Sequence, residues 1–221
     1  MPVVCHHGIV VENKYFADGP YNSGTGLMST ALKSGGYIPL TSPYSEDPRT
    51  IAAIPASIVD WVLVNLRSTA TGATIASQSA LLRNDGRIVG DDGVGNQIGI
   101  EVPDDNYYVE IKHRNHLPIM SSVSQYLQQN TVSLYDYSTA ATQSYDSGVK
   151  EIKSGVWGSW AGDTNNDGQV TTMDYRQWFS AEENGLSGYE ISDINCDGVI
   201  DINDFNIWQT NSRAGAKSSV P

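Results

Sequence analysis

The chain carries one pattern twice near its C-terminus, as Asp163-Thr-Asn165-Asn-Asp167-Gly168-Gln-Val170-Thr-Thr-Met-Asp174 and as Asp193-Ile-Asn195-Cys-Asp197-Gly198-Val-Ile200-Asp-Ile-Asn-Asp204. Each copy has Asp or Asn at positions 1, 3, 5 and 12, glycine at position 6 and an aliphatic residue at position 8. Calcium takes six to eight oxygen ligands, and this spacing supplies oxygens from a tight turn that glycine closes at low cost. The sequence therefore predicts two calcium ions, one in each loop.

A helix is expected after each loop but not before it. The run 154–162, which precedes the first loop, is too rich in glycine to form a helix of any length. The two helices are expected to begin near Thr172 and near Ile202. Position 12 of each loop is Asp, where an EF-hand usually has a bidentate Glu.

This tandem of loop and helix resembles the dockerin family, whose modules lie at the C-terminus of secreted bacterial proteins. The resemblance covers about 162–211. It implies that the ligands of the first loop are Asp163, Asn165, Asp167, the Gln169 carbonyl and Asp174, with Thr171 acting through water. In the second loop it implies Asp193, Asn195, Asp197, the Val199 carbonyl and Asp204, with Asp201 acting through water.

The same resemblance predicts how the two halves meet. Val170 and Ile200 are expected to pair as a short strand between the loops, and Trp178 and Trp208 are expected in the core. Each helix would bury its apolar face on the other, which neither could do alone.

The chain departs from the family at loop positions 10 and 11. Dockerins that bind cohesins tend to repeat a small hydroxyl pair there, whereas this chain has Thr172-Met173 and Ile202-Asn203. Two interpretations stay open: calcium stabilises a fold that has no docking partner, or the module docks a partner protein.

Composition favours an extracellular protein. The chain has 25 acidic residues against 13 Lys and Arg, a formal net charge of -12, which argues against a nucleic-acid partner. No run of eighteen apolar residues occurs, so no membrane span is expected. Use of calcium in the millimolar range implies secretion or the cell surface.

Residues 1–155 are expected to form one β-sandwich with immunoglobulin-like or jelly-roll connections, and 156–221 a small α-helical calcium-binding domain. The run 19–48 is expected to be a long loop with one helical turn near 27–32, and 121–147 a polar approach to the second domain. Strands are expected over 8–16, 57–66, 73–82, 87–89, 97–102, 107–113 and 131–135, with 60–66 as the central strand.

No catalytic set is recognisable, so an enzyme is not expected. His113 and His116 are expected to bond loop carbonyls rather than a metal, since the other histidines are His6 and His7. Cys5 and Cys196 are the two cysteines, and Cys196 stands at a loop position that usually faces solvent. A disulfide between them, two free thiols and a bridge between chains all stay open. The aromatic residues expected to be exposed, and able to stack on a glycan, are Tyr15, Tyr21, Tyr44, Tyr107 and Tyr135.

The whole chain is similar to a C-terminal region of large secreted bacterial surface proteins. The similarity rests on Tyr37-Ile-Pro-Leu, Asp60-Trp-Val-Leu-Val, Asp85-Gly-Arg-Ile-Val89 and His113-Arg-Asn-His116 ahead of the calcium repeats. It implies secretion, a sandwich and calcium, and no reaction.

Two functions are therefore expected. The first is a structural or adhesive subunit that assembles with copies of itself, with the apolar segment from Val3 to Val10 completing the sheet of a neighbour. That segment could equally be the first strand of the chain's own sandwich. The second is an anchoring module that docks a cell-surface protein or carries a glycan-binding domain.

Overall fold

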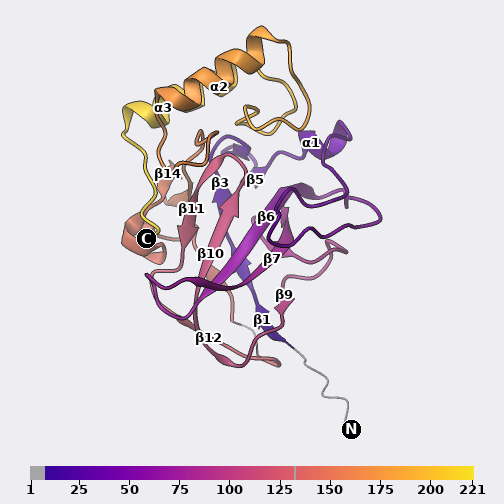
Figure 1. Cartoon of the computed structure of the whole chain (residues 1–221), viewed down its shortest axis with the longest axis vertical. Coiled ribbons are helices and arrows are strands. Elements are labelled where there is room, and N and C mark those ends of the chain that lie inside the picture. Colours follow the sequence, from indigo (N-terminus) through magenta and orange to yellow (C-terminus); the bar gives the residue numbers. More distant parts are fainter. Residues whose placement is uncertain (1–7, 132) are drawn as a thin grey trace.

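The computed structural model describes residues 8–131 and 133–221, and it is mainly β with two helices at one end (Figure 1). The largest sheet is antiparallel and runs in the order β11-β10-β6-β7-β8, and β12 pairs with β10. Its strands are β6 (Ile58–Arg67), β7 (Thr74–Arg83), β8 (Ile88–Val89), β10 (Asp105–His113), β11 (His116–Met120) and β12 (Gln125–Leu127).

Strand β6 is the centre of the molecule, as the sequence predicted. Every residue from Ile58 to Leu66 is buried, because both faces of the strand are covered. On one face Val62 and Val64 join the main core, which also contains Ile9 and other apolar residues of the first strands. On the other face Trp61 packs with Leu32, Ile38 and Ile51 of the long loop region. A strand with two covered faces is expected to be mostly apolar, and in β6 Asp60 and Asn65 are the polar residues among the nine buried ones.

A second layer of short strand pairs covers the main core. β1 (Ile9–Val11) pairs with β9 (Ile98–Ile100), and β2 (Asn13–Lys14) pairs in parallel with β13 (Tyr135–Asp136). β3 (Phe16–Ala17) pairs in parallel with β15 (Val156–Ser159), which pairs with β14 (Lys150–Lys153). β4 (Tyr21–Asn22) and β5 (Leu27–Met28) form a small hairpin. The layered sheets are consistent with a β-sandwich.

Of the two expectations about the connecting segments, the helical turn is present at slightly different bounds and the polar approach is wrong. The helical turn in 19–48 is α1 (Ala31–Ser34), a few residues later than predicted. The run 121–147 is not a polar approach to a second domain, because it contains β12, β13 and the 3₁₀ turns η1 (Ala141–Gln143) and η2 (Tyr145–Ser147). Tyr137 holds this run to the sheet: its ring is buried and its hydroxyl donates to the Val109 carbonyl at 2.9 Å.

The two C-terminal helices begin where the sequence predicted. They are α2 (Thr172–Glu183) and α3 (Ile202–Arg213), and in both a residue of the preceding loop caps the first turn. Trp178 and Trp208 are buried, and they pack around Tyr175 and Phe205 with ring centroids 5.2 to 5.9 Å apart. Within the described residues, no helix is both long and apolar enough to cross a membrane.

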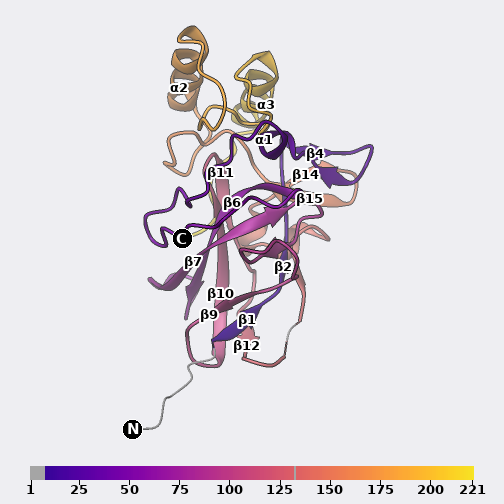
Figure 2. The ribbon, with the colours of Figure 1, turned by 90° about the vertical axis from the view of Figure 1, so that its right-hand side faces the viewer.

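The helical end is joined to the sheets by more than the chain connection (Figure 2). Strand β15 begins at Val156, inside the segment assigned to the second domain, yet it pairs with β3 near the N-terminus. Leu117 of β11 shares a buried cluster with Val170, Ile194 and Trp208. The division into 1–155 and 156–221 stays a prediction. Residues from both sides of this boundary contribute to the same sheet and to the same buried apolar cluster.

Candidate metal centre

The two predicted calcium loops have the same backbone conformation. Position 6 requires a positive φ in both, and Gly168 and Gly198 adopt +83° and +85°. Position 4 is left-handed too, with Asn166 at +56° and Cys196 at +58°. A glycine at position 6 adopts this geometry without the steric cost of a Cβ, which explains its place in the pattern.

The carboxylate at position 1 closes each loop from the inside. The Oδ1 of Asp163 accepts from the Asp167 amide and its Oδ2 from the Gly168 amide, both at 3.1 Å. Asp193 makes the same two bonds, to the amides of Asp197 and Gly198, both at 3.0 Å. Asp163 and Asp193 are 2% and 0% exposed, so these carboxylates lie inside the loops rather than in solvent.

The carboxylate at position 12 ties the loop to its helix. Asp174 accepts from the Thr164 amide at 2.8 Å through Oδ1 and from the Thr171 amide at 2.7 Å through Oδ2. Asp204 repeats this with Ile194 at 2.7 Å and Asp201 at 2.9 Å. The hydrogen bonds between positions 9 and 12 form a capping box in each copy. Thr171 and Asp201 are therefore both loop residues and the N-caps of α2 and α3.

Positions 3 and 5 complete the oxygen set. Asn165 donates to the Asp167 Oδ2 at 2.8 Å and accepts from its amide at 3.0 Å. Asn195 and Asp197 repeat both bonds at 2.9 Å. At position 7, the Gln169 and Val199 amides donate to the carboxylate of position 5 at 3.0 and 2.8 Å. The structure thus brings together the predicted side chains of positions 1, 3, 5 and 12 in both loops.

The charge of these groups fits a divalent cation. Burial, followed by the charges of neighbouring acids, raises the pKa of Asp163 to about 6 and that of Asp204 to about 6. Burial also raises the pKa of Asp193 to about 7, although Arg114 opposes the shift. A bound cation would offset the cost of ionising these buried carboxylates, and carboxylate oxygens are the hard ligands that calcium takes.

The predicted pairing of Val170 with Ile200 was wrong. The Val170 amide donates instead to the Ala216 carbonyl at 2.9 Å, and the Ser218 amide donates to Gly168 at 2.7 Å. In the second loop the Gly188 amide donates to the Gly198 carbonyl at 2.8 Å. Each loop therefore pairs with its own partner segment, because the C-terminal tail lies beside the first loop and the segment between the helices lies beside the second.

Cys196 is buried and not solvent-facing, so that expectation was wrong. It is 1% exposed and belongs to the cluster of Leu32 and Trp61, and its Sγ lies 3.7 Å from Arg114 Nη2. Cys5 lies outside the described residues, as do His6 and His7, so a disulfide, two free thiols and a bridge between chains all stay open.

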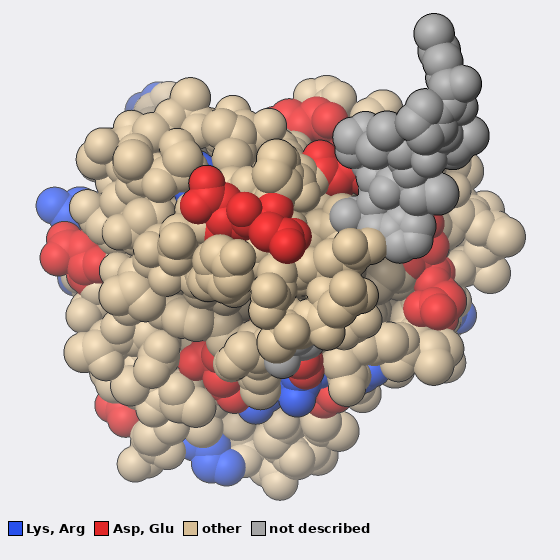
Figure 3. Space-filling model, turned by 90° about the horizontal axis from the view of Figure 1, so that it is seen from below, with Lys and Arg blue, Asp and Glu red and all other residues tan. Residues whose placement is uncertain are grey.

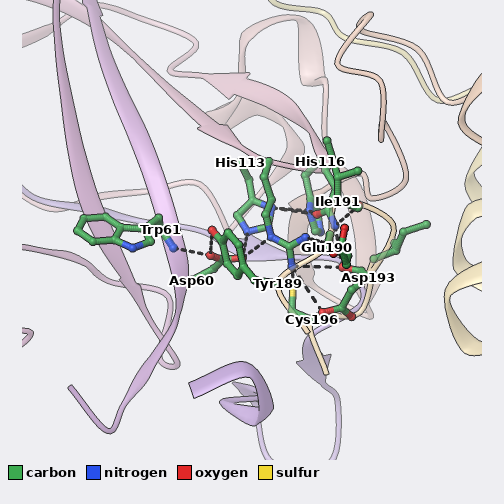
Figure 4. Close-up of polar contacts among 12 residues, drawn as sticks. Asp60, Trp61, His113, His116, Tyr189, Glu190, Ile191, Asp193 and Cys196 are labelled. Atoms are coloured by element: carbon green, nitrogen blue, oxygen red, sulfur yellow. Dashed lines mark hydrogen bonds and ion pairs between the residues drawn. The ribbon is translucent and has the colours of Figure 1, made fainter. Parts of the chain in front are cut away.

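A buried ion pair lies beside the second loop (Figure 4). The Asp60 carboxylate on β6 accepts from Arg114 Nε at 2.8 Å, from the Tyr189 hydroxyl at 2.6 Å and from the Trp61 amide at 2.7 Å. His113 Nε2 lies 3.1 Å from the same carboxylate. Burial alone would raise the pKa of Asp60, but Arg114, His113 and Tyr189 hold it well below its usual range.

Arg114 connects this carboxylate to the second loop. Its guanidinium donates to the Glu190 carbonyl, lies 3.6 Å from Asp193 Oδ2 and stacks 4.6 Å from the centre of the Tyr189 ring. The next residue, Asn115, donates to the carbonyls of Ile191 and Asp193 at 2.9 and 2.7 Å. The turn between β10 and β11 is thus hydrogen-bonded to the segment that leads into the second loop.

Both histidines of this turn were expected to bond loop carbonyls. For His113 this was wrong, because its ring contacts the Asp60 carboxylate and the Asn115 side chain instead. His116 fulfils its predicted structural role, since its Nε2 lies 2.6 Å from the Asp18 carbonyl. Arg114 and Asn115 were missed. Asp60 was the available signal, because an acid inside an apolar strand needs a buried cation. Asp60, His113 and Cys196 lie close enough together to suggest a metal, but the Arg114 guanidinium already contacts Asp60 and Cys196.

The expectation that five tyrosines are exposed was wrong, because none of the five is exposed. Tyr15 and Tyr107 are buried, at 1% and 4% exposed. Tyr21, Tyr44 and Tyr135 are half-buried, and the hydroxyls of Tyr44 and Tyr135 donate to backbone carbonyls. A glycan-binding face stays a prediction.

No protein-family model matches the chain, and a search of curated proteins finds no match. Among solved structures, the chain is similar to one from a type II cohesin–X–dockerin complex of Acetivibrio cellulolyticus with a C-terminal interface mutation. The identity is 15% and the TM-score 0.44, covering 92% of this chain and 94% of that one. An N-terminal interface mutant of the complex gives 16% and 0.39, covering 92% and 91%. With both TM-scores under 0.5, neither match decides the fold or function of this chain.

Proposed function

We propose that this chain is a calcium-stabilised structural module of an extracellular protein, with one ion in each loop. One observation carries the proposal: both loops close through the same hydrogen bonds, and these bonds direct buried carboxylates inward. A loop that needed only a tight turn would not require acids at both ends in each copy. The acidic composition supports the same conclusion, since bound calcium offsets part of it.

In the first loop, Asp163, Asn165, Asp167 and Asp174 would hold the ion, and their equivalents would do so in the second. The ion supplies positive charge that lets these carboxylates ionise without leaving the protein interior. Position 12 also caps the helix that follows, so an ordered loop orders the first turn of α2 or α3. The two calcium-bound loops would then fix the helices in position relative to the sheets.

Titration calorimetry with calcium should give two bound ions per chain. The variants Asp167→Ala and Asp197→Ala should each give one, because each removes the position 5 ligand of a single loop. Asp146→Ala is a matched control: Asp146 lies in the 3₁₀ turn η2, outside both loops, and should leave two ions. A stoichiometry near zero in the unmodified protein would contradict the proposal.

Association with copies of the same chain is the finer part of the proposed function, and an open strand edge supports it. Strand β8 covers β7 only at Leu81 and Leu82, and among the described residues no strand pairs with the outer edge from Thr74 to Gln78. A groove of about 810 Å³ runs along this edge toward β9, and Ile75 is half exposed. Unpaired edges accept strands from other chains.

The donor segment is shorter than the sequence suggested. Ile9 and Val10 belong to the chain's own strand β1, and Val3 to His7 lie outside the described residues. Residues 1–7 carry two histidines and no acid, whereas Asp91, Asp92 and Glu101 line the groove. The view from below also shows more acidic than basic side chains (Figure 3). Residues 1–7 carry no acid, so the carboxylates of the groove, of which Asp91 is paired with Arg49, would not repel them, and this supports residues 1–7 of a second copy as the donor.

Deletion of residues 1–7 should leave a folded monomer where the full chain associates. The deletion ends before β1, so the pairs Ile9–Ile100 and Val11–Ile98 remain. Ile75→Lys should also give a monomer by placing a charge on the acceptor edge. Sedimentation in calcium measures both. Full-length protein that stays monomeric would leave calcium binding intact and favour the docking of another protein or a glycan.

A further inference from the structure

Three side chains from distant parts of the sequence meet where β14 passes below α3 (Figure 1). Lys150 Nζ lies 2.6 Å from Asp18 Oδ2 and 2.8 Å from Asn211 Oδ1. Asn211 Nδ2 donates to the same Asp18 Oδ2 at 2.8 Å. An amine, an amide and a carboxylate are therefore in mutual contact, on β14, on α3 and just after β3.

The three side chains of Lys150, Asp18 and Asn211 are largely buried. Asn211 is 0% exposed, and the side chains of Lys150 and Asp18 are 20% and 14% exposed. The Asn211 Nδ2 also donates to the Ala161 carbonyl at 2.9 Å, which prevents the amide from turning. The ring of Trp160 lies 5.7 Å from the Lys150 nitrogen. These neighbours hold the Lys150 nitrogen against the Asn211 amide in a fixed arrangement.

We propose that Lys150 and Asn211 form an intramolecular isopeptide bond, with Asp18 moving the protons. The Asp18 carboxylate takes a proton from the Lys150 ammonium, and the freed electron pair attacks Cγ of Asn211. The Cγ–Nδ2 bond then breaks as Asp18 returns that proton to Nδ2. The second proton that Nζ loses also leaves with the departing nitrogen, so the products are an amide and one ammonium ion. One C–N bond forms and one breaks, Asp18 is regenerated, and no oxidant or cofactor is required.

The position of Asp18 decides which group is attacked. A single oxygen, Oδ2, contacts both the attacking nitrogen and the departing nitrogen, as a proton shuttle requires. If Lys150 attacked Asp18 instead of Asn211, the three side chains would include no carboxylate to transfer the protons. Lys14 and Asp136 show the contrast: they form a similar ion pair at 3.2 Å, and within the described residues no amide side chain bonds to either.

The bond would link the sheets to the second helix, because β14 pairs with β15 and β15 with β3. It would close a covalent ring across the whole C-terminal repeat, from residue 150 to residue 211. This consequence is independent of calcium, since neither Lys150 nor Asn211 belongs to a loop.

Intact-mass spectrometry of the purified full chain tests the proposal directly. The mass should be about 17 Da below the sum of the residues, the loss of one ammonia. Digestion should release a branched peptide that joins Lys150 to Asn211. Lys150→Met and Asp18→Asn should each restore the full mass. Lys153→Met, on the same strand with its Nζ bonded to the Ser23 carbonyl, should keep the loss.

Other outcomes overturn the proposal. Full mass in folded wild-type protein would mean that the trio is only an ionic network. A loss of about 18 Da, with a branched peptide at Asp18, would make Asp18 the acceptor and remove its role as shuttle. Loss of ammonia without the branched peptide would place the reaction elsewhere. Because the decisive measurement is on the wild-type chain, a variant that fails to fold does not affect it.

Discussion

Replacing Arg114 by leucine should lower the free energy of unfolding by about 3–5 kcal/mol, the cost of leaving a buried charge without its partner. Asp60 would remain at 0% exposed with only His113, Tyr189 and the Trp61 amide as partners. The same change would release the Glu190 and Asp193 carbonyls from the guanidinium. Denaturant unfolding followed by tryptophan fluorescence measures the loss.

Arg49 provides the matched control for this substitution. It pairs with Asp91 at 3.1 Å and Asp47 at 3.4 Å, but the Arg49 side chain is 28% exposed. Exposed pairs contribute at most about 1 kcal/mol, so Arg49→Leu should cost far less than Arg114→Leu. The double variant Asp60→Leu with Arg114→Leu should recover part of the loss, because no unpaired charge remains. Equal losses for the two arginines would show that Arg114 has no special role.

The pH dependence of this effect has a defined sign. The folded-state pKa of Asp60 is lowered, so its contribution to stability is present above the unfolded value of about 3.9 and is lost as pH falls toward the folded value. In wild type Asp60 therefore stays ionised between pH 5 and 8. In Arg114→Leu the guanidinium no longer opposes the effect of burial, so the pKa of Asp60 should rise, and the difference in stability from wild type should shrink as pH falls and the carboxyl takes up a proton.

The loops could be predicted because their information is local. The turns at Gly168 and Gly198 and the starts of the two helices are set by residues close to one another in sequence, and the structure matches them. The ligand role of the loop oxygens stays a prediction. The ion pair of Asp60 and Arg114 could not be predicted, because the two residues are far apart in sequence and only the pairing of β6 with β10 brings them together. A buried acid indicates that a cation exists but not which one.

The second layer of sheets escaped prediction for a related reason. β3 and β15 are too short to show any periodicity, and their parallel pairing joins opposite ends of the chain. Gly158 allows this contact, since a Cβ there would lie 2.7 Å from the Phe16 carbonyl oxygen. The glycine-rich run that excluded a helix before the first loop is therefore a strand whose glycine admits a neighbouring backbone.

Removing calcium should destabilise the whole molecule, not the helical end alone. At about 1 mM calcium and a Kd of about 10 µM, each bound ion stabilises the folded chain by about 2.7 kcal/mol, so chelation should cost about 5 kcal/mol. If 156–221 were a separate domain, as the sequence predicts, 162–211 would melt on chelation while the sheets survived. The structure gives reason to expect one transition, because Leu117 shares its cluster with Trp208 and Arg114 holds the second loop.

Two probes in one thermal melt distinguish these outcomes. Circular dichroism of the sheets and fluorescence of the helix tryptophans should shift together when chelator is added. Asp197→Ala should shift the sheet signal more than Asp167→Ala, because Tyr37 packs against Gly198 so closely that a Cβ there would lie 2.5 Å from its ring. Loss of the helix signal with an unchanged sheet signal would mean that the two parts unfold separately.

The stabilisation by calcium should also grow as pH rises from about 5 to 8. In the calcium-free protein the folded-state pKa values of Asp163 and Asp193 are raised to about 6 and about 7. Their contribution to stability is present below the unfolded value of about 3.9 and is lost as pH rises through 6 and 7. Calcium replaces the proton and removes this loss. Burial holds the pKa of His116 low, but that effect is common to both samples and cancels in their difference. A gap between the two melting temperatures that stays constant from pH 5 to 8 would mean that these carboxylates do not bind the ion.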